Sequence, residues 1–442
     1  MKYSKDDILS LVIDNDVKFI RLQFVDILGN LKNAAITVSQ LEKALDNKCM
    51  FDGSSIVGFT GIEESDMYLY PDLDTFTVFP WRPQQGKVAR IICDIYKPDG
   101  TPFEGYPRYV LKKAVKRAED MGYVFNVGPE CEFFLFRKDD NGNITTVPHD
   151  NGTYFDLGPV DMGENTRREI CLTLEDMGFE VESTHHEMAG GQHEIDIKYD
   201  EALKAADNIL TLKLVVKTAA QRNGLYATFM PKPSEGVHGS GMHVNMSLSR
   251  DGKNVFADAD DKHGLSKEAY SFMAGILKHI KGITAVTNPI VNSYKRFVPG
   301  FDAPTCIAWS DSNRSPLVRI PSIKGELTRI ELRSPDLTCN PYLAFALMLN
   351  AGLDGIEKNM TPPASVDMDM FRMDDKELSA AGIERLPFDL GEALEEMEKD
   401  DIVKATLGEH VYSKYVELKK KEWLDYNRAV SEWEIKNYLG SY

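Results

Sequence analysis

The sequence has few cysteines and no long apolar run. Its 442 residues contain six cysteines, which are widely scattered and form no CxxC pair. This scarcity argues against a disulfide framework or a cysteine zinc site and indicates buried free thiols in a reducing cytoplasm. The longest apolar run, residues 342–349, is much shorter than the roughly 20 residues that cross a bilayer. The opening MKYSKDDILS holds no apolar segment, so no secretory signal is expected.

Positive charge is in deficit as well. The chain carries 51 Lys and Arg against 69 Asp and Glu, a formal net charge of −18 at pH 7. Nucleic acids and anionic membranes bind basic surfaces, so neither partner is expected. Hydrophobic residues make up 43% of the chain, which is enough for a packed core. The length suggests two or three domains of roughly 150 residues.

A stretch rich in proline and glycine, residues 97–107, marks the best domain boundary. Before it, residues 18–25 alternate in polarity, which predicts a strand, and another strand is expected over residues 88–95. We therefore predict an α+β protein, with a small, mainly β domain over residues 1–104 and a large α+β domain over residues 105–442.

The C-terminal region predicts a charged helix over residues 409–437, which carries Trp423 and Trp433. The final residues, 438–442, are apolar enough to dock against protein. Two docking sites are open at this point: the chain's own large domain and a neighbouring subunit.

Four predicted strands in the large domain share one pattern. Glu130 and Glu132 stand two residues apart, and the same alternation recurs in residues 192–197, 242–247 and 329–333. Side chains at i and i+2 of a strand point to the same face. A solvent-facing sheet also alternates, but its polar face is usually rich in Lys and Thr, whereas these faces carry Glu, His, Asn and Arg. Together the four strands favour a polar cavity.

The acidic side chains of this pattern suit hard divalent cations. Carboxylates with a single imidazole select Mg²⁺ or Mn²⁺ over Zn²⁺ or copper, and cations would relieve the repulsion between inward-facing carboxylates. Two neighbouring carboxylates could each serve a different ion of a two-metal site. The candidate ligands are Glu130, Glu132, Glu187, Glu194, Glu331 and His243.

Arginine is the second ingredient of the predicted site. Five arginines, whose guanidinium groups can grip phosphate or carboxylate, fall between residues 296 and 333. Divalent metals together with an arginine cluster are typical of sites that catalyse phosphoryl transfer. No P-loop and no GxGxxG motif follows a strand, but a glycine-rich turn over residues 235–243 would let backbone N–H groups approach an anion.

With these motifs in place, the sequence resembles type I glutamine synthetase, the bacterial and archaeal class, in its short form. The likeness covers nearly the whole chain and is specific in order and spacing. It rests on Phe51-Asp-Gly-Ser-Ser with Glu64-Ser-Asp, Gly128-Pro-Glu-Cys-Glu-Phe-Phe, His185-His-Glu with Gly191-Gln-His-Glu, Lys232-Pro with Gly239-Ser-Gly-Met-His, Asn292-Ser-Tyr-Lys-Arg-Phe-Val-Pro-Gly, Asn313-Arg-Ser, Arg329-Ile-Glu-Leu-Arg and Asn340-Pro-Tyr.

The resemblance implies a fold, a reaction and an assembly. The small domain would be β-grasp-like, and the large domain would resemble ATP-guanido kinases, with a curved antiparallel sheet lining the active site. The reaction would be the ATP-dependent ligation of ammonia to the γ-carboxylate of L-glutamate through γ-glutamyl phosphate, which is a step of nitrogen assimilation. The enzyme would be a cytoplasmic dodecamer of two six-subunit rings, with active sites between subunits.

The resemblance also implies roles for individual residues. One metal would be held by Glu132, Glu187 and Glu194, and the other, nearer the ATP phosphates, by Glu130, His243 and Glu331. ATP would be bound by Glu182, Asn245, Ser247, Arg314 and Arg319. Glutamate would be bound by Gly239, Arg296, Asp302 and Arg333. Catalytic roles would fall to Asp52, Asp302 and Arg314.

Asp52 matches the carboxylate that the family uses to accept a proton from ammonium. On local sequence alone, Asp followed by Gly-Ser-Ser favours a helix or turn cap over a catalytic role. The presence of the other motifs favours the catalytic interpretation.

The sequence departs from the family's usual pattern at five positions. Asp302 stands where the lid normally has Glu, and His238 replaces an Asn beside the glutamate site. Ser234 replaces an apolar residue, and Gly61 stands where many relatives have Arg. Phe371 lies near the tyrosine that is adenylylated in some relatives, so adenylylation is not expected.

Two alternative functions remain open. A γ-glutamyl amine ligase would share the fold and metals but accept a polyamine, and a silenced homologue would serve only in assembly or regulation.

The activity of the enzyme would be controlled by 2-oxoglutarate or a PII-like protein. Arg90 shares a predicted strand face with Val88 and Ile92, so it is either a solvated edge residue or a partly desolvated anchor for a dicarboxylate.

Overall fold

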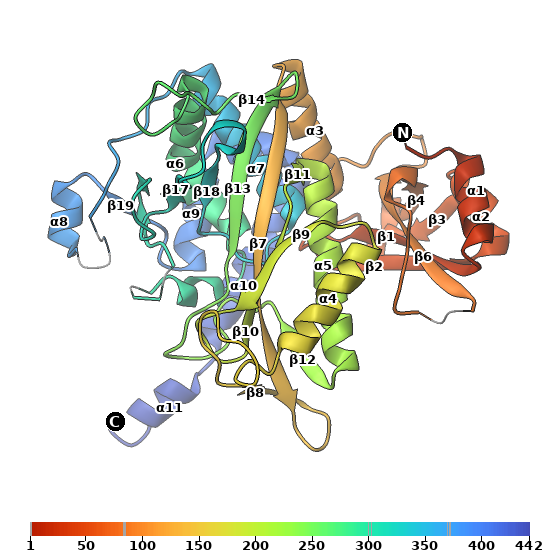
Figure 1. Ribbon diagram of the computed structural model, residues 1–442, viewed down its shortest axis with the longest axis horizontal. Coiled ribbons are helices and arrows are strands. Elements are labelled where there is room, and N and C mark those ends of the chain that lie inside the picture. The colour runs from red at the N-terminus through yellow and green to blue at the C-terminus, as the bar shows by residue number, and fades with distance from the viewer. Residues whose placement is uncertain (1, 83–84, 299, 302, 369, 371–372) are drawn as a thin grey trace.

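Two β-sheets organise the chain, one in each predicted domain (Figure 1). The computed structural model describes residues 2–442 except residues 83–84, 299, 302, 369 and 371–372. The predicted α+β class is confirmed, whereas the division between residues 104 and 105 stays a prediction. No helix in the described ranges combines the length and the hydropathy that a membrane crossing requires.

The small domain folds around a sheet with the strand order β2-β1-β6-β4-β3, in which β1 and β6 are parallel and the other pairs are antiparallel. Strand β6 is central, so Arg90 on it is buried, and the prediction of a solvated edge residue is wrong. The elements are α1 (Lys5–Asp14), β1 (Val17–Val25), β2 (Leu31–Thr37), η1 (Val38–Gln40), α2 (Leu41–Leu45), β3 (Cys49–Asp52), η2 (Gly53–Ser55), η3 (Ile62–Glu64), β4 (Asp66–Pro71), η4 (Leu73–Thr75), β5 (Thr77–Val78) and β6 (Lys87–Tyr96).

The large domain is built on a sheet with the order β16-β17-β18-β13-β7-β10-β9. All of its pairs are antiparallel except β16 with β17, and β15 pairs with β19 apart from it. The strands are β7 (Val124–Lys138), β8 (Ile144–Pro148), β9 (Val181–His186), β10 (Gln192–Ile197), β11 (Asp200–Glu201), β12 (Leu225–Thr228), β13 (Met242–Arg250), β14 (Lys253–Asn254), β15 (Cys306–Ile307), β16 (Trp309–Ser310), β17 (Val318–Arg319), β18 (Ile330–Leu332) and β19 (Glu384–Arg385).

Helices cover the apolar face of this sheet. Helices α3 and α5 pack on β7, and α7 packs on α3, α5 and α6. A Cβ at Gly275 would come within 2.0 Å of the carbonyl oxygen of Ala351, so glycine permits the close approach of α6 and α7. The helices are α3 (Pro107–Asp120), α4 (Glu164–Asp176), α5 (Ala202–Arg222), α6 (Lys267–Thr287), η5 (Ser293–Arg296), η6 (Gly325–Leu327), α7 (Pro341–Glu357), α8 (Asp375–Ala380), α9 (Leu390–Lys399), α10 (Asp401–Arg428) and α11 (Glu432–Tyr438).

A buried arginine ties the two domains of one chain together. Arg108, at the start of α3, donates hydrogen bonds to Asp72 at 2.7 Å and to Asp94 at 2.9 Å, both in the small domain. It also donates to both carboxylate oxygens of Asp207 on α5, at 3.0 and 2.9 Å. These carboxylates compensate the cost of burying the guanidinium, and the shared contacts hold the small domain beside α3 and α5.

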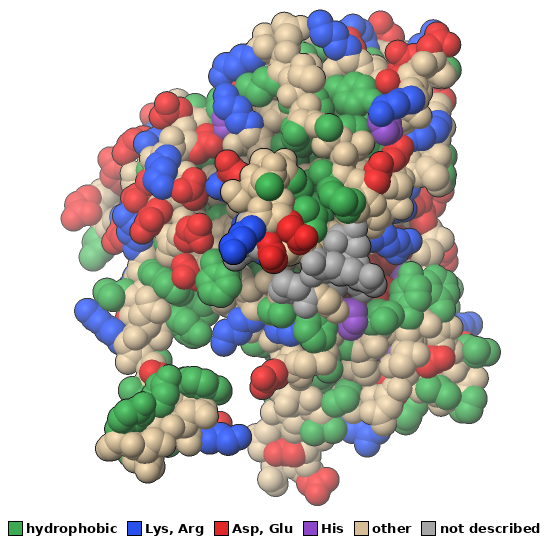
Figure 2. Space-filling model, turned by 90° about the vertical axis from the view of Figure 1, so that its left-hand side faces the viewer, with side chains coloured by type: hydrophobic (Ala, Val, Ile, Leu, Met, Phe, Trp, Pro, Cys, Tyr) green, Lys and Arg blue, Asp and Glu red, His purple; other side chains and the backbone are tan. Residues whose placement is uncertain are grey.

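The C-terminal region differs from the prediction. The predicted continuous helix over residues 409–437 is wrong, because α10 ends at Arg428 and α11 begins after Ser431, whose side chain forms a capping box with Glu434. Helix α11 projects from the body of the chain (Figures 1 and 2) and has no buried residue. Docking on the chain's own domain is therefore also wrong, and Trp433 is 61% exposed.

Candidate active site

The polar face of the large sheet lines a cavity of about 400 Å³. Strand β7 pairs with β10 and β13 in a register that sets Glu132 opposite Glu194 and Glu130 opposite both Asp196 and His243. On β13 the apolar partners Met242, Val244 and Met246 are buried on the other face. The period-two pattern of the sequence therefore becomes a single acidic surface.

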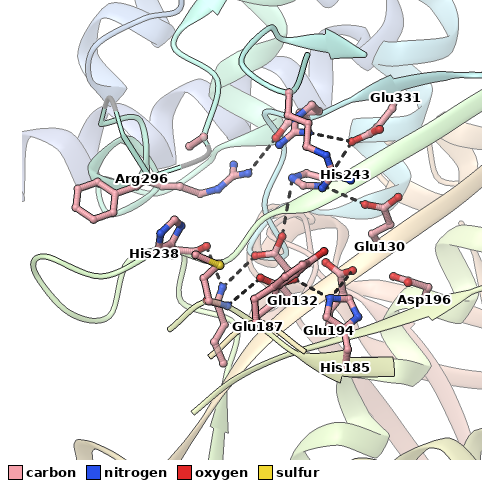
Figure 3. Close-up of a pocket in the computed structure, with 18 of the residues that line it drawn as sticks. Glu130, Glu132, His185, Glu187, Glu194, Asp196, His238, His243, Arg296 and Glu331 are labelled. Carbon is pink, nitrogen blue, oxygen red and sulfur yellow. Dashed lines mark hydrogen bonds and ion pairs between the residues drawn. The ribbon is translucent and has the colours of Figure 1, made fainter. Parts of the chain in front are cut away.

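One group of possible metal ligands lies where β7, β13 and β18 meet (Figure 3). His243 Nδ1 is 3.0 Å from Glu130 Oε2 and 3.6 Å from Glu331 Oε1. Burial opposes ionisation of Glu130, but hydrogen bonding and charge from His243 lower the pKa of Glu130 to about 2. Two carboxylates and one imidazole within this distance fit a divalent cation. The structure thus brings together all three residues predicted for this ion.

A second group lies at the ends of β9 and β10 (Figure 3). His185 Nε2 is 2.8 Å from Glu187 Oε1 and 3.6 Å from Glu194 Oε1. Glu132, which was predicted as the third ligand, lines the same cavity but accepts hydrogen bonds from Gln192 Nε2 at 3.1 Å and from the N–H of Gly241 at 3.0 Å. Its other oxygen is 3.9 Å from His243 Nε2, so Glu132 lies between the two groups.

The carboxylates of this surface repel one another. Burial, followed by the charges of Asp196 and Glu132, raises the pKa of Glu194 well above its usual value. Burial also raises the pKa of Glu132, and it raises the pKa of Asp196 to about 6. Divalent cations would supply the positive charge that offsets burial and repulsion at these carboxylates. The donor set therefore fits the metal that the sequence predicts.

Four of the five predicted arginines face the same cavity. Arg296 is 3% exposed and donates to the carbonyl oxygens of Ser334 at 2.7 Å and Arg333 at 3.0 Å, so its guanidinium is held by backbone rather than by a carboxylate. Arg319 donates to Glu331 at 2.6 Å, which links it to the first metal group. The four are Arg296, Arg314, Arg319 and Arg333.

A second cavity, of about 480 Å³, adjoins the first and shares Glu130 and Asp196 with it. It is lined by three of the residues predicted to bind ATP, namely Glu182, Asn245 and Ser247. The fifth arginine, Arg329, lies here and donates to Asn245 Oδ1 at 2.9 Å. The predicted nucleotide residues are thus divided, because Arg314 and Arg319 line the first cavity.

Known proteins match the chain along its whole length. Residues 104–438 match the family described as glutamine synthetase, catalytic domain, and residues 16–98 match glutamine synthetase, beta-Grasp domain. Glutamine synthetase of Clostridium saccharobutylicum is 62% identical over 441 residues and that of Staphylococcus aureus is 55% identical over 441 residues, with 99% or more of both chains covered. The chain belongs to the glutamine synthetase family. It makes glutamine from glutamate and ammonia with ATP, as the sequence predicts, and enzymes of this family use divalent metal ions.

Two solved structures superpose on nearly the whole chain. A GmaS/ADP complex superposes with a TM-score of 0.90 at 33% identity, covering 98% of this chain and 99% of that chain. Plasmodium falciparum glutamine synthetase superposes with a TM-score of 0.88 at 27% identity, covering 99% of both chains.

Within one chain of this glutamine synthetase, Asp52 is not among the residues that line either cavity. Its carboxylate instead accepts hydrogen bonds from the Ser54 backbone N–H at 2.8 Å and from the Ser54 hydroxyl at 2.7 Å, which lower its pKa. This is the turn cap that local sequence also predicted. Asp302 and Phe371 lie outside the described residues. Phe301, next to Asp302, does line the first cavity, as do Gly239 and His238.

Sequence reasoning missed several residues of the two cavities, among them His185, Tyr154 and Tyr199. His185 stands two residues before Glu187 in the motif His185-His-Glu, which is a signal that the sequence does contain. Tyr199 lines the second cavity and packs beside Gly128, where a Cβ would lie 3.1 Å from Tyr199 Cβ. Tyr154 enters the first cavity from an irregular loop, which carries no periodic pattern that would reveal it.

We predict that the two groups bind cations separately. Glu331→Gln keeps the side-chain shape but removes a negative charge from the group that Glu331 forms with Glu130 and His243. The affinity for one Mn²⁺ ion should therefore fall by about tenfold or more, while the affinity for the other ion stays unchanged. Glu194→Gln should do the converse. Equilibrium binding of Mn²⁺ followed by electron paramagnetic resonance checks both. Glu326→Gln, on the exposed rim of the second cavity, is the control. Retention of two wild-type affinities in the Glu331 variant would contradict the assignment.

Proposed function

We propose that the first cavity binds glutamate with two divalent cations, Mg²⁺ or Mn²⁺, and that the second binds the nucleotide. The observation that carries this proposal is the shared wall at Glu130 and Asp196, which sets a nucleotide-sized cavity directly against the acidic groups. A γ-carboxylate oxygen of glutamate attacks the γ-phosphorus of ATP and the bond to the β-phosphate oxygen breaks, giving γ-glutamyl phosphate and ADP. Ammonia then attacks the acyl carbon, one proton of its nitrogen passes to the phosphate, and phosphate leaves with the bonding electrons.

The proposed role of each residue follows from the charge of its side chain and from the cavity that it lines. When bound, the cations neutralise the phosphoryl oxygens. Arg314 and Arg319 stabilise the charge that develops on the transferred group. The guanidinium of Arg296, whose hydrogen bonds go to backbone carbonyls, keeps its charge for an anionic substrate. The proposed sets are Glu132, Glu187 and Glu194 with His185 for one cation; Glu130, His243 and Glu331 for the other; Gly239, Arg296, Asp302 and Arg333 for glutamate; and Glu182, Asn245, Ser247, Arg314 and Arg319 for ATP.

We predict ammonia rather than a larger amine as the acceptor, because the sequence retains Asp52, which can accept a proton from ammonium, and an acidic residue, Asp302, at the position of the family's lid. Purified protein given ATP, glutamate and Mg²⁺ should release phosphate and form glutamine in equal amounts with ammonium, and should form at least about 100-fold less product with putrescine. Glu331→Gln is the inactive control. Preference for putrescine would favour the γ-glutamyl amine ligase, and no turnover with either amine would favour the silenced homologue.

We propose further that the enzyme assembles as a cytoplasmic dodecamer in which Asp52 serves the cavity of a neighbouring subunit. Asp52 is exposed and stands apart from the cavities of its own chain, while Arg108 holds its domain in place. Helix α11 and the residues that follow it offer Trp433, Leu439 and Tyr442 as exposed apolar side chains for contact with another copy. The six free cysteines fit a reducing cytoplasm.

Subunit complementation tests the shared site. Asp52→Ala and Glu331→Gln should each be inactive alone. Co-expressed in equal amounts, they should recover about a quarter of wild-type activity, because a random mixture pairs an intact large domain with an intact small domain at about that frequency. Mixed assemblies, isolated through a different affinity tag on each variant, provide the activity measurement. Absence of recovery in verified mixed assemblies would place Asp52 and the cavity in the same chain.

Control by 2-oxoglutarate is supported by a third cavity, of about 930 Å³, between the two domains. Arg90 lines it, is 4% exposed, and has no hydrogen-bond partner for Nε or Nη1 among the described residues. Leaving a guanidinium so unsatisfied is costly, and a dicarboxylate would satisfy it. Burial at this depth favours a small ligand over a PII-like protein at this position.

We predict that 2-oxoglutarate lowers the glutamate or ammonium requirement of the wild-type enzyme and has no effect on Arg90→Met. Methionine keeps much of the buried volume and removes the charge-assisted hydrogen bonds, each worth roughly 1.5–3 kcal/mol, so calorimetric affinity should fall by about tenfold or more. Arg82→Met, at an exposed position of the same domain, is the matched control. Equal activation of Arg90→Met and wild type would remove Arg90 from this role.

A further inference from the structure

A buried cluster of three histidines lies beside β10, which carries Glu194, and the end of β9, after which Glu187 follows. His186 and His193 are 0% exposed and His149 is 3% exposed, and their ring nitrogens lie close to the carboxylates of Asp150 and Asp161. On β10, His193 stands between Gln192 and Glu194, which line the cavity, so its ring points to the opposite face of the sheet.

The ligand types resemble a transition-metal site, but the hydrogen bonds argue against one. Arg167 Nη1 lies 2.8 Å from His193 Nδ1, and a guanidinium can only donate. His193 Nδ1 must therefore accept, which leaves the proton of the neutral ring on Nε2, where a metal would need a lone pair. Arg167 also forms an ion pair with Asp161 at 2.6 Å. The cluster is thus a buried polar network that packs behind the active-site strands.

Asp150 is the centre of this network. Its Oδ1 accepts hydrogen bonds from the N–H of Gly191 at 2.9 Å and from His186 Nε2 at 3.0 Å. Its Oδ2 accepts from the N–H of Met162 at 3.0 Å and lies 3.1 Å from His149 Nε2. One carboxylate therefore holds the end of β9 and the residue before β10.

The two points that Asp150 holds are the ends of the turn that presents Glu187. His186 immediately precedes Glu187 and donates from Nδ1 to its carbonyl oxygen at 2.7 Å. Gly191 precedes β10, three residues before Glu194, and its carbonyl oxygen accepts from the N–H of Leu135 on β7 at 2.8 Å. The backbone is tightly packed here, since a Cβ on Gly190 would lie 2.9 Å from the carbonyl oxygen of Asp150. A change at Asp150 would move Glu187 relative to Glu194.

We propose that Asp150 is a positioning residue for the cation bound at Glu187 and Glu194, acting through the Gly191 N–H and His186. This inference rests on the proposed two-cation site. Groups behind metal ligands set the direction of those ligands, and their loss typically costs about 10–100-fold in metal affinity.

The test compares Asp150→Asn with wild type in the full-length enzyme, with Mn²⁺ as the probe. Asn keeps the shape but presents an amide to several N–H donors. We expect the ion at Glu187 and Glu194 to bind about tenfold or more weakly, while the ion at Glu130, His243 and Glu331 is unchanged. Activity should show a raised Mn²⁺ requirement with the maximal rate largely recovered at saturating Mn²⁺, a split that general destabilisation does not produce.

Asp354→Asn is the matched control. Asp354 is 3% exposed and also lies 3.0 Å from a histidine nitrogen, that of His279, but it joins helices far from the metal groups in sequence and fold. It should lower thermal stability and leave both ions unchanged. Equal weakening of both ions in Asp150→Asn, or two wild-type affinities in that variant, would overturn the proposal.

A second variant covers the case in which Asp150→Asn does not fold. His186→Gln keeps a donor toward Asp150 but loses the ring nitrogen that bonds to the carbonyl oxygen of Glu187. It should lower the affinity for the same ion selectively, by a smaller factor than Asp150→Asn does. Unchanged Mn²⁺ binding in His186→Gln would also count against the proposal. If the two-cation site itself is not present, the result is different. Wild type and Glu194→Gln would then bind Mn²⁺ with the same affinity.

Discussion

Repulsion among buried carboxylates is the constraint on which the rest of the site depends. The register of β7 with β10 and β13 places Glu132 opposite Glu194 and Glu130 opposite Asp196, and the other face of these strands is committed to the core. The strands therefore cannot turn their acidic face away without exposing apolar side chains. The raised pKa of Glu194 follows from burial and from these neighbours. Bound cations, together with the arginines of the cavity, would compensate the charge of the ionised carboxylates.

The same logic of paired buried charge fixes the domains. Arg108 draws carboxylates from both domains around one guanidinium, and removing that guanidinium would leave the buried carboxylate of Asp207 without its compensating charge. This attachment holds the small domain beside α3 and α5, with the Asp52 turn exposed. Under the proposed role of Asp52, a carboxylate that lies outside the cavities of its own chain would act on the cavity of another copy. The contact between the domains thereby links the proposed chemistry to assembly.

Much of this could be predicted from sequence because it depends on short-range periodicity. Alternation in residues 242–247 and at Glu130 and Glu132 predicted the acidic face, and the proline and glycine of residues 97–107 predicted where the small sheet ends. What could not be predicted depends on tertiary neighbours. The residues that flank Arg90 in the sequence do not reveal whether it is buried, because its burial follows from the central place of β6 in the sheet. The break before α11 depends on a cap at Ser431. This local signal was not recognised because the charged helical pattern continues on both sides of it.

Strand β10 shows how one pattern serves two purposes. Its odd and even positions divide between the cavity, which receives Glu194, and the interior, which receives His193. A shift of register by one residue would exchange the two sets and bury a carboxylate among Arg167 and Asp161 while exposing a histidine. Both faces therefore select the same register, the cavity face through charge and the interior face through hydrogen bonds. The polar network behind the sheet is, on this argument, as necessary to the geometry of the cation site as the ligands themselves, although no side chain of it reaches the cavity except through the backbone that it holds.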